Sequence, residues 1–139
     1  MDQGLRLTGA VVFVRNLHKS VDFYQDLLGL EVLDTSSTAA LLSSGDGTYL
    51  VLRATGPDAS RPLGALGVQY VVWAMRSRED LDRCEQMLRR RSAYRETRII
   101  GGGVTSVEGH DPDDLVLLLT YADAGSPGPR QLPSRVYAW

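Results

Sequence analysis

The feature that most constrains how this chain folds is a pattern of elements that occurs twice along it. Residues 7–53 and residues 67–121 each read as a strand, a helix and then three strands. In each copy a β-branched and apolar run precedes a stretch with apolar residues at helical spacing, and short apolar runs follow. A strand–helix–three-strand order repeated in this way predicts an α+β fold built from two βαβββ modules.

Capping residues mark the ends of the first helix. The run from Thr8 to Val14 favours a strand, and Asn16 then stands where a helix N-cap is expected, because its side-chain oxygen can accept a backbone N–H of the first turn. Gly29 follows the last apolar residue of the helix and suits a C-terminal position with positive φ. Further strands are expected at residues 31–34, 38–42 and 48–53, with a tight turn at residues 45–47.

The second module repeats this order. Residues 68–74 favour its opening strand, and Ser77 suits the N-cap of its helix. The apolar stripe of that helix predicts a buried, structural thiol at Cys84, and its members are Leu81, Cys84, Met87 and Leu88. The remaining strands are expected at residues 94–100, 104–108 and 115–121, with a DPD turn at residues 111–113.

The composition argues against several classes of partner. With 139 residues and a net charge of -2, the chain gives no reason to expect nucleic acid or an anionic membrane surface. Its apolar runs are too short to span a bilayer, and no basic stretch followed by an apolar one suggests a signal peptide. A single cysteine excludes an internal disulfide, so we expect a cytoplasmic protein.

The modules are expected to form one domain over residues 1–139. The expected parts are module one at about 5–55, a linker rich in Pro and Gly at 56–66, module two at 67–122 and a tail at 123–139. The tail contains Val136, Tyr137 and Trp139, which are apolar for a chain end. We expect it to cover a dimer interface or a pocket.

Two motifs on this framework resemble a known superfamily. They are DFYQDLLGLEV at residues 22–32 and DPD at residues 111–113. At this separation on a doubled βαβββ pattern, they resemble the vicinal oxygen chelate superfamily of glyoxalases, extradiol dioxygenases and bleomycin-type resistance proteins, over about residues 5–122. The resemblance implies that the two sheets curve as an open barrel around a cavity and that two chains form a homodimer.

The resemblance also identifies the positions where catalytic members hold a divalent metal with His and Glu. Those positions match Gly9, Val51, Tyr70 and Leu118, with Gln69 as the alternative for the third. None of them offers the imidazole or carboxylate that such a metal requires, and Gln69 offers one neutral oxygen. We therefore expect no metal and no other cofactor.

Replacing these ligands predicts an apolar pocket in place of a metal site. Side chains alternate across a strand, so the predicted ligand-binding residues share faces with the former ligand positions: Gly9, Val11, Phe13, Tyr49, Val51, Arg53, Gln69, Tyr70, Trp73 and Leu118. The sequence does not decide which face of the strand at residues 68–74 points inward. Either Tyr70, Val72 and Ala74 or Gln69, Val71 and Trp73 line the pocket. The lining suits a flat aromatic ligand, with Arg53 or Gln69 fixing a carbonyl or carboxylate.

This pocket favours a binding protein over an enzyme. The first hypothesis is metal-independent binding and sequestration of a hydrophobic or aromatic small molecule, such as an antibiotic or natural product. The alternative is a metal-independent isomerase, cyclase or epimerase of the same fold, which requires an acid or base in the cavity. The candidates for that role are His110, Glu108, Asp111 and Tyr70, with Asp111 orienting His110. A ligand sensor or a purely structural module is a third reading.

Overall fold

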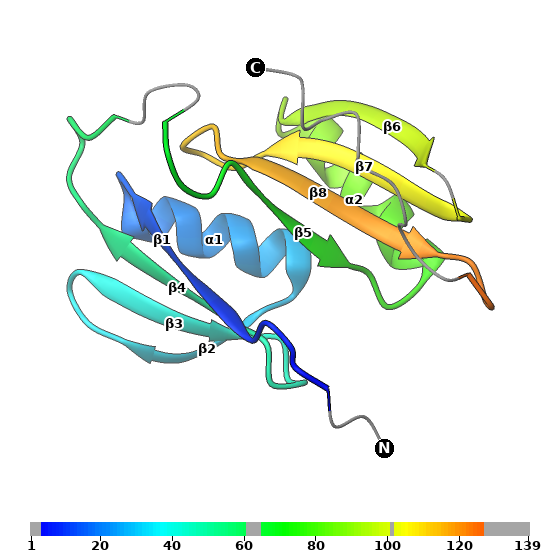
Figure 1. The fold of residues 1–139 in the computed structure, drawn as a ribbon. Coiled ribbons are helices and arrows are strands. Elements are labelled where there is room, and N and C mark those ends of the chain that lie inside the picture. The colour runs from blue at the N-terminus through cyan, green and yellow to red at the C-terminus, as the bar shows by residue number, and fades with distance from the viewer. Residues whose placement is uncertain (1–3, 61–64, 101, 127–139) are drawn as a thin grey trace. The chain divides into compact units, whose positions relative to one another are not determined.

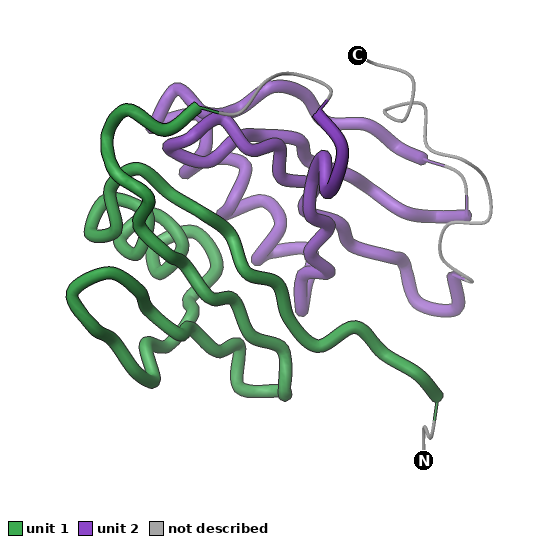
Figure 2. The backbone as a smooth tube through the Cα atoms, turned by 60° about the vertical axis from the view of Figure 1, so that its left-hand side comes forward, with its two compact units in different colours: residues 1–60 green, residues 61–139 purple. Residues whose placement is uncertain are grey.

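The chain divides into two compact units, residues 1–60 and residues 61–139 (Figure 2). The computed structural model describes residues 4–60, 65–100 and 102–126, and each unit contains one βαβββ module. Part of the predicted linker and the end of the predicted tail, with Val136, Tyr137 and Trp139, lie outside the described residues. No helix in the described part of the chain is long and apolar enough to cross a membrane.

Unit 1 is a four-stranded mixed sheet with one helix (Figure 1). The strand order in the sheet is β1-β4-β3-β2, with β1 parallel to β4 and the other neighbours antiparallel. Its elements are β1 (Gly9–Val14), α1 (Leu17–Leu28), β2 (Glu31–Thr35), β3 (Ala39–Ser43) and β4 (Tyr49–Ala54).

Helix α1 begins and ends at the residues that its sequence predicts. The Asn16 side chain accepts a hydrogen bond from the Lys19 N–H at 3.1 Å, and Gly29 closes the helix with a φ of 66°. The helix contacts β3 and β4. The core of unit 1 is fully buried on this side of the sheet and includes Phe23, Tyr24, Leu27, Leu42, Leu50 and Leu52.

Asp46 holds the tight turn between β3 and β4. Its Oδ1 accepts hydrogen bonds from the Ser44 hydroxyl and from the Thr48 N–H at 3.0 Å. These bonds, that from Ser44 above all, lower the pKa of Asp46 from 3.8 to about 2.

The depressed pKa of Asp46 predicts a specific acid dependence. A carboxylate whose pKa is lower in the folded state stabilises that state above its ordinary pKa, and the contribution is lost as the pH falls through about 2. We expect carboxyl NMR titration to give a midpoint near pH 2 for Asp46, and Ser44→Ala to raise it. A midpoint at the ordinary value of 3.8 in the unmodified protein would contradict this account of the turn.

Unit 2 repeats the architecture of unit 1. The strand order is β5-β8-β7-β6, with β5 parallel to β8 and the other neighbours antiparallel. Its elements are β5 (Tyr70–Ala74), α2 (Arg78–Arg90), β6 (Tyr94–Ile100), β7 (Val104–His110) and β8 (Val116–Ala122). The predicted strand at residues 68–74 begins only at Tyr70. The Gln69 amide donates hydrogen bonds to the carbonyls of Ala65 and Gly67 in the preceding loop.

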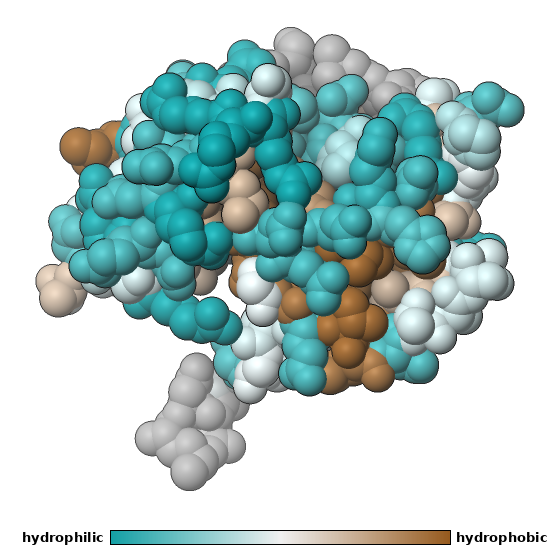
Figure 3. Space-filling view, turned by 180° about the vertical axis from the view of Figure 1, so that it is seen from behind, coloured by the Kyte–Doolittle hydropathy of each residue, from teal (hydrophilic) through white to brown (hydrophobic). Residues whose placement is uncertain are grey.

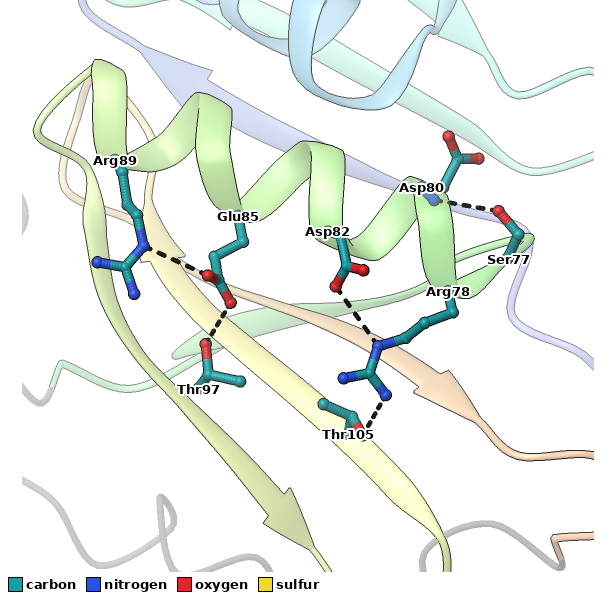
Figure 4. Close-up of polar contacts among 8 residues, drawn as sticks. All are labelled: Ser77, Arg78, Asp80, Asp82, Glu85, Arg89, Thr97 and Thr105. Atoms are coloured by element: carbon teal, nitrogen blue, oxygen red, sulfur yellow. Dashed lines mark hydrogen bonds and ion pairs between the residues drawn. The ribbon is translucent and has the colours of Figure 1, made fainter.

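Polar contacts fix helix α2 along its length (Figure 4). Ser77 caps the helix by accepting the Asp80 N–H at 3.0 Å, as predicted. Arg78 pairs with Asp82 at 3.4 Å and donates to the Thr105 hydroxyl of β7 at 3.3 Å. Further contacts join the other end of the helix to β6: Glu85 pairs with Arg89 at 3.3 Å and accepts the Thr97 hydroxyl at 2.7 Å.

The inner side of α2 carries the core of unit 2. Leu81, Cys84 and Leu88 are buried there as predicted, whereas Met87 is only half-buried. Burial raises the pKa of the Cys84 thiol, which fits a structural and unreactive cysteine. Viewed from behind, much of the surface is hydrophilic, and a hydrophobic area lies in the lower part of the view, to the right of its centre (Figure 3).

The α+β class and the two βαβββ modules are therefore confirmed. Among the described residues the strands form two separate four-stranded sheets, and neither closes into a barrel. His18 is exposed in the first turn of α1.

Candidate functional site

One face of the sheet in unit 1 carries no helix. The parallel pairing of β1 with β4 sets Gly9 beside Tyr49, Val11 beside Val51 and Phe13 beside Arg53. The residues between them in β4, Leu50 and Leu52, are buried on the side of α1, so these six residues share the opposite face. We call this set, Gly9, Val11, Phe13, Tyr49, Val51 and Arg53, the helix-free face of unit 1.

Apolar and aromatic side chains on this face remain accessible. Val11 is 61% exposed, Phe13 59% and Tyr49 42%. Large apolar groups on neighbouring strands rarely stay this exposed without a partner, because burying them is favourable by about 25 cal/mol per Å². The helix-free face of unit 1 is therefore able to take up an apolar molecule.

The Tyr49 ring lies over Gly9. A Cβ atom built on Gly9 would overlap the ring and lie 2.6 Å from its Cδ2. Gly9 does not have a positive φ, so this close approach, and not backbone conformation, explains why the position suits glycine. The ring thus occupies space that any larger side chain at position 9 needs.

Arg53 is a cation on this otherwise apolar face. Its Cζ lies 5.4 Å from the centroid of the Phe13 ring, within the range of a cation–π contact. Within the described ranges, no carboxylate pairs with its guanidinium. The group therefore has its hydrogen-bond donors available to a ligand.

The register of β5 is settled by its partner strand. Tyr70, Val72 and Ala74 pair with Val116, Leu118 and Thr120 of β8. The intervening residues of β8, Leu117 and Leu119, are 1% and 0% exposed and belong to the core beneath α2. Tyr70 and Leu118 therefore share the helix-free face of unit 2, defined by Tyr70, Val72, Ala74, Glu108, His110, Val116, Leu118 and Thr120.

Gln69 and Trp73 do not join the other predicted ligand-binding residues. Trp73 pairs with Leu119 and so faces the side of α2, and its buried Nε1 has no hydrogen-bond partner among the described residues. Gln69 precedes β5, and its amide is held by the loop. Of the two alternative registers, the structure thus has Tyr70, and not Gln69, on the face of Leu118.

The acid–base candidates of unit 2 lie on its helix-free face. In β7, Glu108 pairs with Leu118 and His110 with Val116. The Glu108 side chain is 5% exposed and forms an ion pair with Arg95 at 3.2 Å. Arg95 was not predicted, because it lies at the irregularity of β6 between Tyr94 and Glu96, which the sequence pattern does not mark.

The His110 imidazole lies beside the main chain of Asp111 and the carboxylate of Asp114. The His110 Nδ1 lies 3.2 Å from the main-chain oxygen of Asp111 and 3.6 Å from Oδ1 of Asp114. The Asp111 Oδ1 accepts the N–H groups of Asp113 and Leu115. Asp111 therefore stabilises the turn, and the Asp114 carboxylate lies near the imidazole.

The four positions inferred from the resemblance do not fit a catalytic metal. Gly9 and Val51 lie on the helix-free face of unit 1, and Tyr70 and Leu118 on that of unit 2, but none offers an imidazole or carboxylate. Over the described ranges, His, Cys, Asp and Glu form no group of three or more that could hold a metal ion. The Tyr49 ring also fills the space beside Gly9.

Comparison with known protein families identifies the chain. The model of the glyoxalase/bleomycin resistance protein/dioxygenase superfamily matches residues 6–115. The match spans most of the sequence, so the chain belongs to this superfamily. A search of curated proteins finds no match.

Solved structures agree with this fold. A glyoxylase/bleomycin resistance protein/dioxygenase domain from Frankia sp. EAN1pec aligns with a TM-score of 0.73 and 21% identity, over 89% of this chain and 96% of that chain. A lactoylglutathione lyase from Agrobacterium tumefaciens aligns with a TM-score of 0.67 and 17% identity, over 86% of this chain and 96% of that chain. The fosfomycin resistance protein FosX from Listeria monocytogenes aligns with a TM-score of 0.65 and 17% identity, over 89% of this chain and 97% of that chain. At these identities the likeness establishes the fold alone.

Proposed function

We propose that this superfamily member binds a hydrophobic or aromatic small molecule without a metal and sequesters it, as a resistance protein does. The observation that carries the proposal is the helix-free face of unit 1, where Phe13, Tyr49 and Val11 are exposed together. Aromatic side chains provide large flat contact areas for a planar ligand. Solved structures of similar fold include fosfomycin resistance proteins, which is compatible with a protective role.

The proposal includes the setting in which the protein acts. We propose a cytoplasmic homodimer, as the resemblance to this superfamily suggests, with no nucleic acid or membrane partner. The ligand class is an antibiotic or another natural product, because a binder that leaves its ligand unchanged protects by holding it away from its target.

Calorimetric titration in the presence of a chelator tests the proposal. A planar aromatic acid (anthraquinone-2-carboxylate) and a neutral antibiotic (mitomycin) are each titrated into the protein, and each ligand is recovered and analysed by mass spectrometry. We expect saturable binding with an unchanged ligand, weakened about tenfold by Phe13→Ala, because the ring loses its stacking contact. The control is Ile99→Ala, which removes an 85% exposed apolar side chain from β6 in unit 2. Failure of both compounds to bind would contradict the proposal, and so would equal affinities of Phe13→Ala and Ile99→Ala.

A metal-independent enzyme is the second candidate. The observation that favours it is the placement of Tyr70, Glu108 and His110 on the helix-free face of unit 2, where a buried carboxylate and an imidazole lie on the same strand. Such a pair is able to move a proton within a bound substrate. Recovery of an isomerised ligand, together with loss of the conversion in His110→Gln, would establish this candidate in place of sequestration.

A further inference from the structure

We propose that the ligand of the helix-free face of unit 1 is a planar aromatic acid, whose rings lie along Tyr49 and Val51 and whose oxyanion is held by Arg53. This inference rests on the proposed function, and it deepens that function by naming the charge and the shape of the ligand. It follows from the position of Arg53, from the charges around it and from the spacing of the residues on the face.

The guanidinium of Arg53 is oriented but not neutralised. Phe13 supports it through the cation–π contact at 5.4 Å, and its other cross-strand neighbour, Ala39 of β3, is small and uncharged. A planar guanidinium that lies against a ring keeps its outward N–H groups in a fork that matches a carboxylate, sulfonate or phosphate. Arg53 is thus prepared for an anion without having one among the residues that the structure describes.

Acidic residues on the same side of the sheet lie too far away to serve as its partner. Asp34 of β2 pairs with Leu41 of β3, which pairs with Val51 of β4. Two strand spacings separate Asp34 from β4, which amounts to about 10 Å. The Asp34 Oδ1 also accepts the N–H of Thr35 at 2.9 Å. Within unit 1, Asp34 is therefore not a partner of Arg53, which leaves the guanidinium able to attract an anionic ligand.

The spacing along β4 sets the length of the ligand. Tyr49 and Arg53 are four residues apart on one strand and face the same side, so their Cα atoms are separated by about 13 Å. Val51 lies between them and Val11 beside it, which gives an apolar floor. A planar system of roughly three or four rings with an acidic group at one end spans this distance.

Binding of such a ligand strengthens its own ion pair. A ring system that covers Val11, Val51 and Phe13 removes water from beside Arg53, and the attraction between two charges increases as the surroundings become less polar. An uncharged ligand of the same shape forms no ion pair with Arg53. It also leaves the guanidinium partly covered without an anion, which is unfavourable. The face therefore distinguishes an aromatic acid from its neutral analogue.

Two fluorescent probes of matched shape test this inference. Anilinonaphthalene sulfonate carries an oxyanion, whereas N-phenylnaphthylamine has the same ring skeleton without one. We expect the unmodified protein to bind the sulfonate more tightly than the neutral probe. Arg53→Gln is expected to lower the affinity for the sulfonate at least tenfold and to change the affinity for the neutral probe less than threefold, since only the charge-assisted hydrogen bonds are lost.

Two further measurements separate a local pair from general charge attraction. Arg90→Gln makes the same change of net charge at the exposed end of α2 and is expected to leave both probes unaffected. Raising the salt concentration is expected to lower the affinity of the unmodified protein for the sulfonate, and to lower that of Arg53→Gln much less. Circular dichroism of each variant verifies that the fold is retained.

The outcomes separate this inference from the proposed function. If the neutral probe binds and Arg53→Gln leaves the sulfonate unchanged, the preference for an acid is wrong, while binding of aromatic molecules stands. If neither probe binds to the folded protein, both the inference and the proposed function fail. If Arg90→Gln weakens the sulfonate as much as Arg53→Gln does, the attraction is not local and the inference fails.

Discussion

Asp111→Ala is expected to lower the free energy of unfolding by about 2–4 kcal/mol. The Asp111 Oδ1 accepts the N–H of Asp113 at 2.8 Å and that of Leu115 at 3.0 Å, and the residue is 1% exposed. Alanine removes this acceptor and leaves the backbone donor of the buried Leu115 without it. The turn also starts β8, so its loss affects the strand that pairs with both β5 and β7.

Chemical denaturation followed by circular dichroism measures this loss. Asp111→Asn keeps an oxygen in the position of Oδ1 but loses its charge, so we expect it to recover most of the stability. Asp114→Gly is the matched control in the same turn: Asp114 has a φ of 67°, which glycine adopts without strain, and we expect a small change or a gain. An Asp111→Ala protein as stable as the unmodified one would show that these hydrogen bonds contribute little.

The local elements were predictable because their determinants are local. Asn16, Ser77 and Gly29 act on the backbone within a few residues, and the structure has each of them at the predicted helix end. The two helices and the individual strands also follow from hydrophobic periodicity, which requires no knowledge of distant partners. The βαβββ order was therefore readable in both modules.

The face that a strand presents depends on residues far away in the sequence. Residues 68–74 alternate in a way that suits either register, because both faces contain apolar residues. Pairing of Trp73 with Leu119 decides between them, and that pairing joins segments separated by the whole of α2, β6 and β7. A single sequence contains no direct record of such a contact.

The candidate site was predictable only as a set of positions. Alternation along β1 and β4 correctly grouped Gly9, Val11 and Phe13 with one another, and the register then places them beside Tyr49, Val51 and Arg53. The contact of Arg53 with Phe13 and the position of the Tyr49 ring depend on side-chain conformations and cross-strand neighbours. The roles of these residues in binding remain predictions for the experiments above.

Gly109→Ala is expected to lower the free energy of unfolding by about 1–3 kcal/mol. A Cβ atom at Gly109 would lie 2.7 Å from the main-chain oxygen of Ala93 and 2.8 Å from Cδ1 of Leu88. The Ala93 oxygen also accepts the N–H of His110 at 3.0 Å, so it cannot move away without weakening a hydrogen bond that joins β7 to the residue before β6. Gly109 does not have a positive φ, and the cost therefore comes from packing.

Gly9→Ala is the matched comparison for Gly109→Ala. Both glycines lie in strands without a positive φ, but the atoms nearest to the new methyl group at position 9 belong to the ring of Tyr49, a side chain that is 42% exposed. We expect a loss below about 1 kcal/mol for Gly9→Ala, with a displaced Tyr49 ring visible in NMR spectra. Equal losses of the free energy of unfolding in the two variants, measured by denaturant titration, would contradict this distinction. A methyl group that meets the backbone cannot be accommodated by the movement of a side chain.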